Sequence, residues 1–137
     1  EIEREQQILL GTIESWRRAW EENDAENYLS YYSDNFLTEK WDASTWRDHK
    51  LNVNTQNERR RILINDLSVL KSKNIYHIRF VQTYTSSTLN DVGFKHLFLV
   101  KEANGLKIVS ENWTPLKQFS ASPAFQYAYK ESAQNSM

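Results

Sequence analysis

The hydrophobic pattern changes its period once, between residues 54 and 61, and this change constrains the fold more than any other feature of the sequence. Before it, apolar residues recur at spacings of three and four, and the clearest run is Leu9, Ile13, Trp16 and Trp20. That spacing follows one face of a helix. After it, stretches of branched and aromatic residues alternate with turn residues, as strands and turns do. Helices followed by consecutive strands predict an α+β domain.

Capping and turn residues set the expected boundaries. We predict helices over residues 1–22, from the N-cap Asp24 to about residue 33, and over about 44–54, with strands over 61–70, 76–85, 93–102 and 106–113. Asn104-Gly105 predicts a tight turn, and Pro115 ends the last strand. We expect residues 1–116 to form one domain whose helices cover one face of a curved antiparallel sheet. Residues 117–137 are expected to be a C-terminal tail, partly ordered or packed on the domain or a partner.

Composition removes several classes of function. The 17 basic and 18 acidic residues give a net charge of −1, which disfavours nucleic acid as a partner. The absence of cysteine excludes disulfides, thiolate nucleophiles and cysteine metal sites. The three histidines show no metal-ligand spacing, so we expect no metal site. We also expect no cofactor. No apolar run reaches the ~18 residues of a membrane span, so membrane insertion is not expected.

Register counting from the Asn104-Gly105 turn pairs Leu99 with Val109. With Tyr84 set opposite Lys95, it predicts a polar cluster on one sheet face, below the helices. Two interpretations remain open: a pocket at the open end of the helix-covered sheet, or an internal polar network that fixes the packing of helices on strands. The pocket candidates are Tyr32, Trp46, Lys50, Gln82, Tyr84, Lys95, Glu111 and Trp113. Five aromatic residues are likewise compatible with sugar stacking or with core lining, which is favoured: Tyr28, Tyr31, Tyr32, Trp41 and Trp46.

The opposite sheet face is too apolar for a fully wet surface. Its members are Val81, Phe94, His96, Phe98, Val100 and Ile108. A homodimer formed through this face is the favoured explanation. The alternative is that the C-terminal tail, with Phe119, Phe125 and Tyr127, folds over it.

Acid–base catalysis has four candidates in this sequence: Glu111, Lys95, Tyr84 and His49. A general acid or base needs a pKa near the working pH. A Lys95 partner would instead hold Glu111 ionised, which favours a structural or binding pair over a proton shuttle. No residue is therefore assigned as catalytic.

Ordered motifs across residues 5–114 resemble a known superfamily. The run Ser15-Trp16-Arg17-Arg18-Ala19-Trp20, followed by Asp24, Tyr28, Tyr31-Tyr32-Ser33 and Phe36, resembles the opening of a nuclear transport factor 2-like (SnoaL-like) domain. Phe80 to Ser86, Asp91 to Leu97, Gly105 to Ile108 and Glu111-Asn112-Trp113 resemble the version attached C-terminally to bacterial L,D-transpeptidase (YkuD-type) envelope proteins. This sequence has Leu106 where the related motif Gly-x-Trp-Lys-Ile has tryptophan.

The resemblance implies a cone-like fold, with three N-terminal helices on a strongly curved antiparallel sheet of about four main strands and a cavity at the wide end. It implies dimerisation through the sheet and a periplasmic or cell-envelope location. The implied function is a non-catalytic accessory domain of a peptidoglycan-modifying protein, for dimerisation and for binding a small molecule or glycan. A catalytic or repeat domain would lie elsewhere in the parent chain, because this sequence lacks the transpeptidase cysteine. The alternative is a small cone-fold isomerase, dehydratase or polyketide cyclase.

Overall fold

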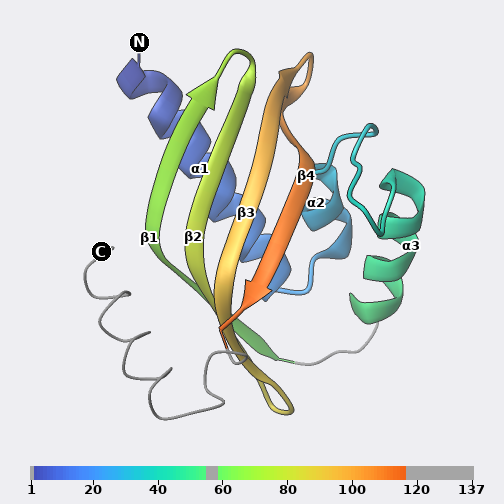
Figure 1. Cartoon of the computed structure of the whole chain (residues 1–137). Helices are drawn as coiled ribbons and strands as arrows, with labels where there is room; N and C mark the ends of the chain where they lie inside the picture. Colours follow the sequence, from blue (N-terminus) through green and yellow to red (C-terminus); the bar gives the residue numbers. More distant parts are fainter. Residues whose placement is uncertain (1, 55–58, 117–137) are drawn as a thin grey trace.

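The computed structural model describes residues 2–54 and 59–116, and these form three helices followed by a four-stranded antiparallel sheet (Figure 1). The helices are α1 (Ile2–Glu21), α2 (Ala25–Ser30) and α3 (Ala43–Asn54). The strands are β1 (Arg60–Ser72), β2 (Ile75–Ser86), β3 (Asn90–Glu102) and β4 (Gly105–Pro115). The α+β class and the order of elements are confirmed. The expected tail, residues 117–137, lies outside the described residues. Within the described ranges no helix is long and apolar enough to cross a membrane.

Local capping explains where the helices begin and end. Asp24 caps α2 as predicted, since its side chain accepts a hydrogen bond from the backbone N–H of Asn27. Asp42 caps α3 by accepting from the N–H of Thr45 at 2.9 Å. The second helix stops earlier than predicted, at Ser30, because the next residues pair with β4. The N–H of Ile108 donates to the carbonyl of Tyr31 at 2.8 Å, and this contact draws the chain out of the helix.

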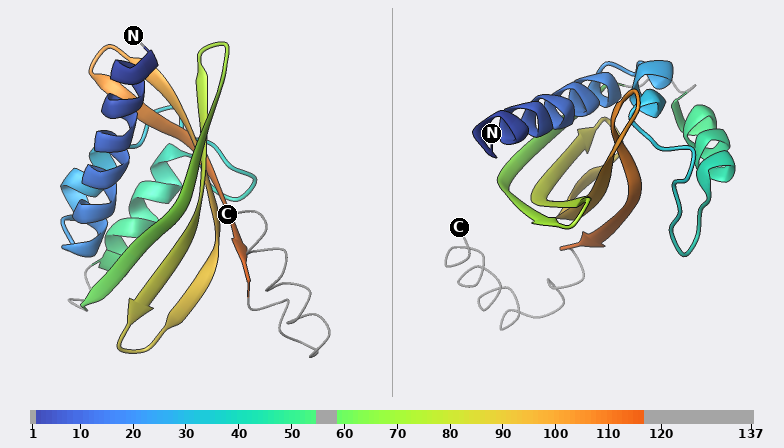
Figure 2. Two further views of the ribbon diagram at one scale, coloured as in Figure 1. Left: turned by 90° about the vertical axis from the view of Figure 1, so that its left-hand side faces the viewer. Right: turned by 90° about the horizontal axis from the view of Figure 1, so that it is seen from above.

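The sheet runs β1-β2-β3-β4 without a crossover, and Figure 2 shows that it is strongly twisted and curved. The long helix α1 lies along its concave side, while α3 stands beyond β4 (Figures 1 and 2). The core lies between α1, α2 and the inner sheet face. Its fully buried members include Leu9, Trp16, Tyr28, Phe36, Ile62, Ile78, Phe80, Leu97, Leu99 and Ile108.

The predicted strand faces are right for β2 and β3, although the register between these strands is not. Phe80, rather than Tyr84, lies opposite Lys95. The displacement arises because β2 and β3 continue to Ser86 and Asn90 and leave a short connection. Since this displacement is an even number of residues, every side chain keeps its predicted face.

The prediction for Ile108 was wrong. A β-bulge between β3 and β4 places Leu99 opposite Ile108 instead of Val109. The extra residue lies on β4, so the β4 side chains between the bulge and the turn point to the face opposite to the predicted one. Ile108 is therefore fully buried in the core, and its backbone pairs with that of Tyr32. It cannot belong to the outer sheet face.

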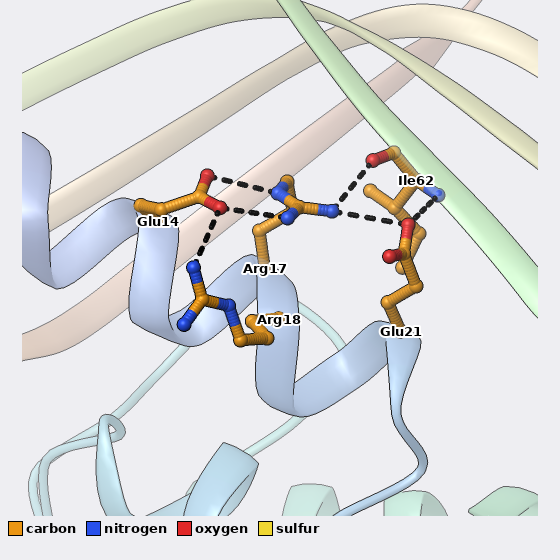
Figure 3. Close-up of polar contacts among 5 residues, drawn as sticks. All are labelled: Glu14, Arg17, Arg18, Glu21 and Ile62. Carbon is orange, nitrogen blue, oxygen red and sulfur yellow. Dashed lines mark hydrogen bonds and ion pairs between the residues drawn. The ribbon is translucent and has the colours of Figure 1, made fainter.

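Two charged residues of α1 hold the helix against β1, which is an edge strand (Figure 3). Arg17 donates to the carbonyl of Ile62 at 3.1 Å, and Glu21 accepts from the N–H of the same residue at 2.9 Å. Arg17 also pairs with Glu14 and Glu21. Side chains thus occupy backbone groups that an edge strand would otherwise expose.

Candidate functional site

A cavity of about 940 Å³ opens between α3, the connection before it, and the inner face of the sheet. Seven of the eight predicted pocket residues line it: Trp46, Lys50, Gln82, Tyr84, Lys95, Glu111 and Trp113. The eighth, Tyr32, is buried beneath and bonded to Glu111. The other lining residues are Trp20, Thr38, Glu39, Lys40, Trp41, Val53, Arg60, Leu89, Asp91, Ser110 and Asn112.

Element periodicity explains how residues distant in sequence meet at this cavity. On α3, Trp46, Lys50 and Val53 follow one another at spacings of four and three, so they share the helix face that lines the cavity. On the sheet, alternate residues point to the same side. Gln82 and Lys95 therefore come to the inner face from neighbouring strands, and Glu111 joins them from β4.

Lys95 and Glu111 form a buried ion pair at the inner end of the cavity. Their charged atoms are 2.9 Å apart, and the two side chains are 9% and 8% exposed. The hydroxyl of Tyr32 donates to the other carboxylate oxygen at 2.6 Å. Trp16 donates to the same hydroxyl at 3.2 Å, and Tyr28 lies 3.0 Å from it. A polar network therefore runs from the cavity into the core.

This network keeps Glu111 ionised. Burial acts to raise the pKa of its carboxyl, but Lys95, Lys50 and the Tyr32 hydroxyl outweigh it and hold that pKa below its usual value. Burial and the Glu111 charge raise the pKa of Tyr32 well above its usual range. Glu111 is thus a carboxylate and Tyr32 a neutral phenol near pH 7. Neither is suited to exchange a proton with a ligand at that pH.

Lys50, on α3, is surrounded by three aromatic rings. Its ammonium lies 4.7 Å from the ring centre of Trp46, 5.5 Å from Trp20 and 5.9 Å from Tyr28. It makes no hydrogen bond or ion pair with any residue of the described ranges. Burial lowers the pKa of Lys50 to about 8, with the Lys95 charge acting in the same direction and Glu111 opposing it.

Two further polar atoms at the cavity lack partners. The indole N–H of Trp46 and the amide oxygen of Gln82 are buried, and neither has a hydrogen-bond partner within residues 2–54 and 59–116. Both side chains line the cavity. Buried polar groups are ordinarily bonded, so each such atom calls for an explanation.

Sequence reasoning missed several lining residues. Trp20 follows the helix-face pattern of Leu9, Ile13 and Trp16, yet its ring also lies 5.6 Å from that of Tyr84 in a tilted contact and lines the cavity. Arg60 lies in the basic run Arg59-Arg60-Arg61, which is typical of a solvated junction between a helix and a strand, but it is 8% exposed and faces the same space. No local signal identifies either residue, because both are brought to the cavity by the packing of α1 on β1 and β2. His49 stacks on Trp41 and is not among the lining residues.

The outer face of the sheet carries the other predicted group, without Ile108. Val81, Phe94, His96, Phe98 and Val100 are partly exposed there. Strand pairing adds four exposed apolar residues to the same face: Leu63, Leu70, Ile75 and Val92. His77 and His96 are joined by a 2.8 Å hydrogen bond, and His77 stacks on Phe98. No cluster of three metal-ligating side chains occurs in the part of the chain that the structure describes.

Known structures share this fold. Bd1075 of Bdellovibrio bacteriovorus is 27% identical with a TM-score of 0.76, and the alignment covers 84% of this chain and 42% of that chain. The helical cell shape determining protein Pgp2 of Campylobacter jejuni is 22% identical with a TM-score of 0.69, over 76% of this chain and 39% of that one. This chain thus spans about two fifths of each of these proteins.

A third structure belongs to a Streptomyces avermitilis protein of the NTF2-like family, provisionally assigned as a dehydratase. It is 10% identical with a TM-score of 0.75, over 85% of this chain and 99% of that one. No curated protein matches the sequence significantly. The family model described as the Cds6 C-terminal NTF2-like domain matches residues 8–112, which include all three helices in whole or part and nearly the whole sheet. The chain therefore belongs to the family of Cds6 C-terminal NTF2-like domains.

Proposed function

We propose that this domain is a non-catalytic accessory domain of a bacterial cell-envelope protein that modifies peptidoglycan. It would bind a small molecule or glycan in the cavity and dimerise through the outer sheet face. The family match, the likeness to a cell shape determining protein and the resemblance to domains attached to L,D-transpeptidases support this role. Because Bd1075 and Pgp2 are more than twice as long as the matched region, a catalytic or repeat domain in the same parent chain is part of the proposal.

The observation that carries the proposal is a large cavity whose buried carboxylate is already engaged. Glu111 is committed to Lys95 and Tyr32, which leaves it unsuited to proton transfer. The walls offer aromatic rings from Trp20, Trp46 and Trp113. Apolar walls with a few placed polar groups are typical of binding sites, and flat rings can pack against sugar faces.

Binding is tested by titrating the domain with soluble fragments from a peptidoglycan digest while tryptophan fluorescence is followed. Four of the five tryptophans line the cavity, so a bound fragment should change the emission in a saturable way. Mass spectrometry of the fragments after prolonged incubation tests the non-catalytic part. Absence of saturable binding would overturn the binding role, whereas altered fragments would overturn the non-catalytic one.

Dimerisation is tested by sedimentation at rising protein concentration. We expect the unmodified domain to dimerise, because association would bury an apolar sheet face. Leu70→Lys combined with Val92→Lys places two charges on exposed positions of that face and should give monomers. Ile8→Lys, at an exposed position on α1, is the matched control and should leave the dimer intact. A strict monomer at every concentration would refute the dimer.

One observation favours the alternative, a small enzyme of the isomerase, dehydratase or cyclase type. Lys50 borders the cavity with a pKa of about 8, close to the range in which a general base works. Under this alternative, turnover of a cavity ligand would be lost in Lys50→Gln. Unchanged ligand in the presence of the unmodified domain would refute it.

A further inference from the structure

Among the described residues, the charges that line the cavity do not balance. Residues 2–54 and 59–116 contribute four cationic side chains, Lys40, Lys50, Arg60 and Lys95, and three anionic ones, Glu39, Asp91 and Glu111. At the inner end, the ammonium groups of Lys50 and Lys95 share one carboxylate, that of Glu111. Lys95 makes the direct ion pair, so Lys50 is left with aromatic ring faces. Ring faces replace only part of the water that an ammonium loses on burial.

We propose that the cavity selects ligands bearing a carboxylate and that this carboxylate binds at the Lys50 ammonium; this rests on the proposed ligand-binding function. A single negative charge would match the excess of one positive charge among the described lining residues. It would also give the ammonium the ion pair that residues 2–54 and 59–116 do not supply. Charge-assisted hydrogen bonds of this kind are the strong ones.

Two unpartnered atoms of the cavity residues, the indole N–H of Trp46 and the amide oxygen of Gln82, indicate which other groups the ligand carries. The ring of Trp46 is centred 4.7 Å from the ammonium, and its buried N–H lacks an acceptor within the described residues, so an oxygen atom of the same ligand that reaches it would satisfy it. The buried oxygen of Gln82 needs a donor, which a ligand hydroxyl or amide N–H would provide. A compact acid that also carries hydroxyl or amide groups satisfies all three. Sugar acids and N-acylated amino acids belong to this class.

The first experiment compares three probes by calorimetry: N-acetylmuramic acid, its methyl ester, and N-acetylglucosamine, which lacks the lactyl acid altogether. We expect the acid to bind about tenfold to hundredfold more tightly than the ester or the neutral sugar. Equal affinities for acid and ester would overturn the carboxylate proposal and leave ligand binding intact. No binding of any of the three would also overturn it, and the peptidoglycan digest then decides separately whether the binding function stands.

Variants locate the contact. Lys50→Gln should abolish the preference for the acid, whereas Lys50→Arg, which keeps the positive charge, should retain most of it. Lys101→Gln removes one lysine charge at an exposed position outside the cavity and should bind like the unmodified domain. Circular dichroism of each variant checks that it is folded. An acid preference that survives in Lys50→Gln would place the carboxylate elsewhere and refute the assignment.

The pH dependence of binding separates a direct charge contact from a structural role. The groups that act on Lys50 are Glu111, Lys95 and Arg60 from the sheet, His49 on its own helix, and the ring of Tyr28. With a pKa of about 8 in the empty cavity, Lys50 is mostly charged at pH 7 and mostly neutral at pH 9. Affinity for the acid should therefore fall about tenfold over this interval. In Lys50→Arg the fall should disappear, and a pH-independent affinity in the unmodified domain would contradict the proposal.

Discussion

Glu111→Gln should be the most informative single change for stability. It removes the negative charge from the buried pair and leaves the Lys95 ammonium, 9% exposed, without its partner. The amide can still accept the hydrogen bond from Tyr32, so the loss is mainly electrostatic. Breaking a buried pair by removing one charge costs about 3–5 kcal/mol, against about 0–1 kcal/mol for a surface pair. We expect a loss of about 3 kcal/mol, which lowers Tm by about 10 °C.

The assay is urea unfolding followed by circular dichroism, with the double variant Lys95→Met/Glu111→Gln as the partner measurement. Removing both charges relieves the unpaired ammonium, so the double variant should be about 2 kcal/mol more stable than Glu111→Gln alone. The difference in free energy of unfolding between the unmodified domain and Glu111→Gln should narrow as the pH falls below 4.5. At that pH the Glu111 carboxyl takes up a proton in the unfolded chain first, because its pKa is lower in the folded domain. A loss below about 1 kcal/mol in Glu111→Gln, or a double variant that is no more stable than Glu111→Gln, would refute the buried-pair interpretation.

Three other predictions follow from the fold. Gly93→Ala should cost about 1–3 kcal/mol in a thermal melt, because the added Cβ would lie 2.5 Å from the Thr114 carbonyl oxygen; an unchanged Tm would contradict the close approach of β3 and β4. Arg17→Met should lower urea stability by about 1–3 kcal/mol through loss of the β1 contact, while Arg18→Met, whose side chain is 62% exposed, should change it by less than about 0.5 kcal/mol; equal effects would refute the proposed role of Arg17. Burial and the neighbouring His77 lower the pKa of His96, so folding stability should decline as pH falls below 6.5 because the unfolded chain binds that proton first; His96→Gln should flatten this part of the urea-stability profile, and an identical profile would refute the contribution.

The sequence by itself determined the order of the elements and the side of the sheet on which most strand residues lie. Helix and strand periods depend only on neighbours a few positions away, so they can be counted along the chain. The predicted faces of β2 and β3 stayed correct despite a register error, because the error was an even number of residues and side chains alternate with a period of two. The association of Lys95 with Glu111 was also predictable, because two opposite charges on one buried face have to find each other.

Tertiary structure alone decided the features that depend on contacts between distant residues. A bulge turns Ile108 inward. At the same position the backbone of β4 pairs with residues 31–33, which lie more than seventy positions earlier in the chain. The packing of α1 on β1 and β2 brings Trp20 and Arg60 to the cavity, where no local pattern places them. The surroundings of Lys50 were decided in the same way: α3 supplies the lysine, while α1, α2 and the sheet supply the rings and charges that set its pKa. Periodicity specifies faces, but a cavity exists only where separately determined faces meet.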